Sequence, residues 1–117
     1  MFGVPEIDSR ELARILQEAP DSIQLIDVRT PQEAAQGIIE GAELVPLHLV
    51  PLRADDWSRD GRPMVVYCRS GARSAQACAF LAGRGGGRQF INLRGGLLDW
   101  ARQGLPIVLP QASSASA

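Results

Sequence analysis

The stretch MVVYCRSGARSAQACAFL, residues 64–81, sets the expected fold of this chain. Its first four residues, Met64 to Tyr67, are apolar and rich in valine, which is typical of a strand buried on both faces. Residues 74–81 are rich in alanine and indicate a helix, which the glycines from Gly83 onward end. Cys68 therefore stands between the end of a buried strand and a loop that leads into a helix.

The same alternation of strand and helix continues on both sides of this stretch. Further strands are expected at 23–28, 43–45 and 89–93, and further helices at 9–18, from 30 to just before Gly37, within 49–60 and at 97–101. Asp8 and Thr30 stand at helix starts as caps, followed three residues later by Glu11 and Glu33, as in a capping box. This order predicts an α/β layer fold around a mainly parallel sheet. We expect one domain over residues 1–110 and a disordered tail at 111–117.

Composition argues against several classes of function. The 117 residues carry a net charge of −1, which disfavours a surface for nucleic acid or for an anionic membrane. All twelve basic residues are arginine, so no lysine is available for Schiff-base chemistry. Two cysteines and one histidine, His48, suit neither a disulfide framework nor a metal site. Without a signal-peptide pattern or an apolar run of about 20 residues, we expect a cytoplasmic protein with reduced thiols.

The surroundings of Cys68 predict a reactive thiolate. An ordinary cysteine is only a few per cent thiolate at neutral pH, and making it mostly thiolate takes about 2–3 kcal/mol of preferential anion stabilisation. A helix start supplies at most about 2 kcal/mol, and Arg69 and Arg73 add positive potential. Ser70 and Gly71 are small enough to let successive backbone N–H groups turn inward as an anion nest. Cys68 is therefore the predicted nucleophile.

Cys78, the second cysteine, has none of these features. It lies at helical spacing with Ala75, Ala79 and Ala82, and we expect this face to be packed in the core. No histidine stands near Cys68 in the sequence, which argues against a cysteine–histidine protease pair.

The loop YCRSGARS, residues 67–74, resembles the active-site loop of the rhodanese (thiosulfate sulfurtransferase-like) family. Three further motifs resemble the same family in the expected order: LIDVR at 25–29, GA at 41–42 followed by VPL at 45–47, and NLRGG at 92–96 with Trp100, Gly104 and Pro106. The resemblance covers about residues 6–107. It implies a three-layer rhodanese-like α/β domain in which helices flank a central, mostly parallel, five-stranded sheet.

The resemblance also implies a sulfur transfer in two steps, without a cofactor. Cys68 would take the outer sulfur of a small anionic donor such as thiosulfate, as a persulfide, and pass it to cyanide or a thiol, including a protein thiol. Asp27 and Arg29 match a family position that supports the site, and we interpret them as architecture rather than as catalysts. The residues expected to bind the donor are those of the loop: Arg69, Ser70, Gly71, Ala72, Arg73 and Ser74.

The chain departs from the family pattern in two places. Family members often carry His-Ile-Pro-Gly-Ala where this chain has IIEGA at 38–42, so Ile38 and Glu40 replace the usual histidine and proline. Because that histidine is normally structural, we expect altered local packing with activity intact. Ala72 stands where asparagine is common, a change that could alter donor preference.

Two other functions fit part of this pattern. Phosphotyrosine phosphatases of a related fold grip phosphate with an arginine six positions after the cysteine, but here that position is Ser74, and Arg73 is the fifth. The loop is therefore expected to be too tight for phosphate. The second alternative is a non-enzymatic rhodanese-like module that binds a partner or relays sulfur between proteins. Modules that only bind usually lack the cysteine, which this chain keeps.

Overall fold

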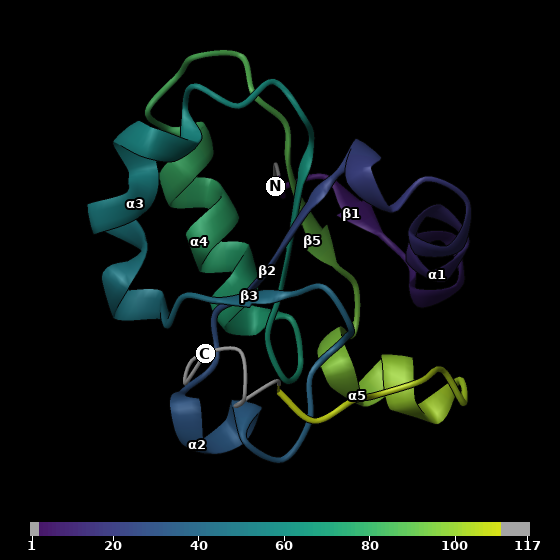
Figure 1. Ribbon diagram of the computed structural model, residues 1–117. Coiled ribbons are helices and arrows are strands. Elements are labelled where there is room, and N and C mark those ends of the chain that lie inside the picture. Colours follow the sequence, from purple (N-terminus) through teal and green to yellow (C-terminus); the bar gives the residue numbers. More distant parts are fainter. Residues whose placement is uncertain (1–2, 111–117) are drawn as a thin grey trace, which may run out of the picture.

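Five strands form a single sheet in the computed structural model, which describes residues 3–110 (Figure 1). The strands are β1 (Glu6–Ile7), β2 (Gln24–Asp27), β3 (Glu43–Leu44), β4 (Met64–Tyr67) and β5 (Phe90–Leu93). Their order is β1-β5-β4-β2-β3, and every neighbouring pair is parallel. The strand before Cys68 is therefore the central one, and all its residues are buried. Because the strands are parallel, their carboxyl ends meet at one edge of the sheet.

Helices cover both faces of this sheet. They are α1 (Ser9–Glu18), α2 (Pro31–Ala34), α3 (Val50–Trp57), α4 (Ala72–Ala82) and α5 (Gly96–Arg102), with short 3-10 turns η1 (Pro20–Ser22) and η2 (Leu47–Leu49). Met64 and Val66 of β4 belong to a core cluster with residues of α3 and α4, whereas Val65 and Tyr67 pack with residues of α1 and α5. Figure 1 shows these helix pairs on opposite sides of the sheet. The expected three-layer α/β domain is confirmed.

The predicted capping box is complete at α2 and only partly formed at α1. Thr30 and Glu33 form the complete capping box, each side chain bonding the other residue's backbone N–H. At α1, Asp8 accepts a hydrogen bond from the Glu11 N–H at 2.8 Å. The Glu11 side chain does not reach back as predicted, because it pairs with Arg14 one turn further along the exposed face.

The start of α4 and its packed face differ from the prediction. The helix begins at Ala72, two residues earlier than expected, and Cys78 is fully buried as expected. Its packed face consists of Ser74, Ala77, Cys78 and Leu81, whereas Ala79 and Ala82, predicted to pack, are exposed. Alanine lines both faces of this helix and fits either environment, so its spacing could not distinguish the face that meets the sheet.

Two small elements escape sequence analysis. Strand β1 has only two residues, and it exists because Glu6 and Ile7 pair with Asn92 and Leu93 at the edge of the sheet. An isolated antiparallel bridge joins Ile38 to Val108 and ties the segment after α5 to the loop after α2. Residues 111–117, predicted to form a disordered tail, lie outside the described residues. Within residues 3–110, no helix is long and apolar enough to cross a membrane.

Candidate active site

Cys68 lies directly after β4, and its sulfur is enclosed by the loop that leads to α4. The residue is 1% exposed. Its Sγ accepts hydrogen bonds from the backbone N–H of Gly71 at 3.1 Å and of Ser74 at 3.4 Å, with the Ser74 hydroxyl also at 3.4 Å. Gly71 adopts φ +106°, which other residues rarely adopt, and this turn caps α4. Gly71 of the predicted nest thus donates to the sulfur, and the second backbone N–H at hydrogen-bond distance is that of Ser74.

The carbonyl groups of the same loop bind the start of α5. The Leu97 N–H donates to the Cys68 carbonyl at 2.9 Å, and the Leu98 N–H donates to the Arg69 carbonyl at 3.0 Å. This approach requires glycine at position 96, because a Cβ there would lie 2.5 Å from the Arg69 carbonyl oxygen and 2.6 Å from that of Cys68. The NLRGG motif thus holds the loop from outside while the N–H groups of the loop face the sulfur.

Burial and hydrogen bonding act on the Cys68 thiol in opposite directions. Burial raises its pKa, whereas hydrogen bonds from the Ser74 hydroxyl and from the N–H groups of Ser74, Gly71 and Ser70 lower it, and the net pKa lies below the usual value. Cys78 experiences burial alone, which raises its pKa to about 12. The site therefore stabilises the thiolate of Cys68 relative to that of an ordinary cysteine, whereas burial destabilises the thiolate of Cys78.

Asp27 and Arg29 form a buried ion pair at the carboxyl end of β2. Arg29 donates to Asp27 from Nε at 3.0 Å and from Nη2 at 2.7 Å, and both side chains are at most 5% exposed. The Arg29 Nη2 also reaches the Gly37 carbonyl at 2.7 Å, which fixes the end of the α2 connection. Such a planar, two-point contact gives rigidity. Their arrangement agrees with an architectural role beside the loop.

The segment that departs from the family pattern is held without histidine or proline. The buried Tyr67 hydroxyl accepts a hydrogen bond from the Ile39 N–H at 3.1 Å. Burial raises the pKa of Tyr67 above its usual value, and the nearby Asp27 carboxylate raises it further. Ile38 exchanges backbone hydrogen bonds with Val108, whereas the Glu40 side chain is exposed. Hydrogen bonds with Tyr67, at the end of β4, and with the segment after α5 thus hold this loop in place.

The two arginines of the loop have different surroundings. Arg73 donates to both carboxylate oxygens of Glu33, at 2.7 and 2.9 Å, and so joins α4 to α2. The contact with Arg73 lowers the pKa of Glu33 to about 2, with the Thr30 N–H contributing as well. Arg69 is exposed and has no ion-pair partner within residues 3–110. Of the two loop arginines, Arg69 is therefore the one whose guanidinium forms no ion pair among the described residues.

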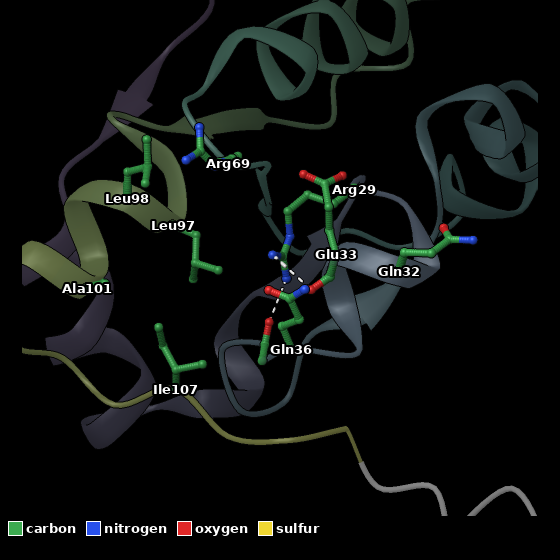
Figure 2. Close-up of a pocket in the computed structure, with 10 residues that line it drawn as sticks. Arg29, Gln32, Glu33, Gln36, Arg69, Leu97, Leu98, Ala101 and Ile107 are labelled. Carbon is green, nitrogen blue, oxygen red and sulfur yellow. Dashed lines mark hydrogen bonds between the residues drawn. The ribbon is translucent and has the colours of Figure 1, made fainter.

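Arg69 also lines a cleft of about 370 Å³ between α2 and α5 (Figure 2). Figure 2 shows Arg69, Leu97 and Leu98 on one side and Arg29, Glu33 and Gln36 on the other. Gln32, Gly37, Ala101 and Ile107 complete the lining. One wall is therefore polar and carries amide groups, and the opposite wall is largely aliphatic. Cys68 does not line this cleft, but its chain neighbour Arg69 does.

The structure brings most of the predicted loop residues to the sulfur. Gly71 and Ser74 donate hydrogen bonds to the Cys68 sulfur and the Ser70 N–H contributes to its lowered pKa, whereas the Ala72 side chain is exposed. The sequence did not indicate a role in the site for Asn92, Gly96 or Glu33. These residues contact Ser74, the loop carbonyls and Arg73, respectively. The first two belong to the NLRGG motif, so the motif was the available signal, but their contacts depend on tertiary structure.

A comparison with protein families agrees with this geometry. The rhodanese-like domain family matches residues 8–103, so this chain belongs to the rhodanese-like domain family. A sulfurtransferase of Allochromatium vinosum is 53% identical over 108 residues, which cover 92% of this chain and 98% of that relative. The putative sulfurtransferase YtwF of Bacillus subtilis is 33% identical over 89 residues, covering 76% of this chain and 84% of that relative.

The fold comparison gives the same result. The crystal structure of a rhodanese-like domain protein from Staphylococcus aureus superposes with a TM-score of 0.78 and 28% sequence identity, covering 92% of this chain and 100% of that one. Family membership and the sulfurtransferase relative together support a sulfurtransferase or sulfur-relay activity for this chain.

Proposed function

We propose that this protein moves a sulfane sulfur from a small anionic donor such as thiosulfate, through a persulfide on Cys68, to a thiophilic acceptor. In the first step the Cys68 thiolate attacks the outer sulfur of thiosulfate. The Sγ–S bond forms as the donor's S–S bond breaks, and sulfite leaves with the electron pair. In the second step cyanide or a thiolate attacks the outer sulfur of the persulfide, and Cys68 returns as a thiolate.

The observation that carries this proposal is the ring of donors around the Cys68 sulfur. The N–H groups of Gly71 and Ser74 lie within 3.4 Å of Sγ and favour an anion there. The persulfide is an anion too, and its outer sulfur carries the charge, so the same positive environment supports both enzyme forms. No external base is needed once the thiol is held as a thiolate.

We assign recruitment of the anionic donor mainly to Arg69. Its guanidinium is exposed, is next to Cys68 in the chain and has no ion-pair partner among residues 3–110. Arg73 already gives both of its terminal nitrogens to Glu33. Its proposed role is to hold α2 against α4 and to contribute long-range positive potential. This engagement also speaks against a phosphatase, since Arg73 is not free to grip a phosphate.

The cleft beside Arg69 is the proposed contact surface for the body of the acceptor, since Cys68 itself does not line it. Cyanide needs no cleft, whereas a thiol on a larger molecule could contact the aliphatic wall of Leu97, Leu98 and Ile107 while its sulfur approaches Cys68. A protein thiol is therefore the favoured physiological acceptor, and the protein would act as the middle member of a sulfur relay. We place this reaction in the cytoplasm, because that compartment keeps thiols reduced.

Intact mass spectrometry tests the proposal directly. After exposure of the reduced protein to thiosulfate, we expect one added sulfur of about 32 Da, which cyanide removes. Cys68→Ser should gain no mass, whereas Cys78→Ser, the matched control, should gain and lose it like the native protein. Absence of an adduct with thiosulfate and with other sulfane donors would refute a sulfurtransferase function.

A further inference from the structure

Asn92 contacts both residues that donate to the Cys68 sulfur. It lies on β5, is 3% exposed and stands in register with Val66 of β4 and Glu6 of β1. Its Nδ2 donates to the Gly71 carbonyl at 3.2 Å, and its Oδ1 accepts from the Ser74 hydroxyl at 2.5 Å. A single buried side chain therefore holds the residue that caps α4, Gly71, and a residue of its first turn, Ser74.

The partners of Asn92 fix the orientation of its amide. Two acceptors, the Gly71 carbonyl and a Glu6 carboxylate oxygen at 3.4 Å, face the Nδ2 group, and one hydroxyl faces Oδ1. A flipped amide would direct its oxygen at both acceptors. The charged groups near the network are Glu6, which accepts from Asn92 Nδ2, with its partner Arg94, and Arg73 on α4, which Cys68 and Asp27 influence in turn.

The Ser74 hydroxyl has one hydrogen and two neighbours that can accept it. Oδ1 of Asn92 lies at 2.5 Å and Sγ of Cys68 at 3.4 Å. While the sulfur is a neutral thiol, the hydroxyl hydrogen stays on the shorter bond to Asn92 and the thiol can donate to the Ser74 oxygen. When the sulfur ionises, the backbone N–H groups of Gly71 and Ser74 face it, and the hydroxyl hydrogen can turn towards it only if the Ser74 oxygen moves away from Oδ1, because two oxygen acceptors repel at 2.5 Å.

We propose that Asn92 is a positioning residue that holds Gly71 and Ser74 in the arrangement in which both donate to the Cys68 sulfur. Without the amide, the Gly71 carbonyl loses its buried donor, and the turn that directs its N–H at Sγ loses its anchor. The Ser74 hydroxyl also loses the partner that fixes its rotamer. The side-chain hydrogen bonds of Asn92 go to Gly71, Ser74 and Glu6 and not to the sulfur. This inference rests on the proposed function, in which Cys68 is the nucleophile.

The test is the pH dependence of Cys68 alkylation by iodoacetamide, read from the mass of the modified peptide. Asn92→Leu keeps the side-chain volume, and we expect its alkylation midpoint to move up by about one pH unit, with a rate at pH 7 about five- to tenfold lower. If that variant does not fold, Asn92→Ser replaces it, since serine is too short to reach both partners. Alkylation requires neither donor nor acceptor, so this result is independent of whether thiosulfate forms a persulfide.

Two controls separate positioning from general stability. Gln24→Leu removes an amide from β2, where Gln24 binds Arg88 at the end of the sheet far from the site, and should leave the alkylation midpoint unchanged. Ser74→Ala should raise the midpoint in the native background and have less than half that effect in Asn92→Leu, because Asn92 acts partly through Ser74. A midpoint for Asn92→Leu within about 0.2 unit of the native value, with stability lost as in Gln24→Leu, would overturn the proposal.

Discussion

Replacement of Gly96 by alanine should damage the site through backbone contact alone. The added Cβ would lie 2.5 Å from the Arg69 carbonyl oxygen and 2.6 Å from that of Cys68, where contact distances of about 3.4 Å are normal. α5 must therefore move away from the loop and weaken the Leu97 and Leu98 hydrogen bonds to these carbonyls. Overpacking costs about 1–3 kcal/mol and the left-handed φ of +60° about 1 kcal/mol, so we expect about 2–4 kcal/mol of lost stability.

Gly104→Ala is the matched control for this change. Gly104 also has a left-handed φ, +78°, but an added Cβ there would meet nothing within 4 Å. It should lose only the backbone contribution of about 1 kcal/mol. Urea denaturation of both variants gives the difference, and alkylation of Cys68 shows whether the loop has moved.

The rate of persulfide formation should differ more between Gly96→Ala and Gly104→Ala than their stabilities do. We expect Gly96→Ala to form the Cys68 persulfide at least about tenfold more slowly, while Gly104→Ala keeps the native rate. If both variants lose equal stability and Cys68 reacts normally in Gly96→Ala, the close approach of α5 does not shape the loop, and the reasoning fails.

Three further changes test other parts of the site. Arg69→Ala should raise the thiosulfate concentration for half-maximal persulfide formation about tenfold, and Arg73→Ala clearly less; the reverse order would contradict the assignment of donor binding to Arg69. Because the pKa of Glu33 is lowered to about 2, its pair with Arg73 stabilises the fold above about pH 4.3 and loses this effect as pH falls towards 2. The free energies of unfolding of the native protein and of Glu33→Gln, measured by urea titration, should therefore approach each other from pH 5 to pH 3. Tyr67→Phe leaves the buried Ile39 N–H without its acceptor and should cost about 1–3 kcal/mol in thermal or urea unfolding; an unchanged value would mean that this N–H finds another partner.

Most of the fold could be predicted from the sequence because its signals are local. The apolar run 64–67 formed the central strand, and Thr30, Pro31 and Glu33 formed the cap of α2 as predicted. Strand β1 could not be found in this way, because two residues carry no periodicity and become a strand only by pairing with β5. The packed face of α4 was assigned wrongly for a related reason, since an alanine-rich helix has no strong apolar stripe.

Some features of the candidate site could also be predicted from local sequence, whereas others depend on tertiary contacts. The sequence alone predicted Cys68 as the nucleophile, together with its loop and the small residues that allow a nest, because Cys68, Gly71 and Ser74 lie within seven consecutive residues. Only the tertiary structure could show which of Arg69 and Arg73 forms an ion pair, because Glu33, the partner of Arg73, is 40 residues away in the chain. It also decided that Asn92 and Gly96 contact the loop, because parallel strands bring the connections after β4 and β5 to the same edge of the sheet. Contacts between such distant segments depend on strand order and register, which no local pattern of residues encodes.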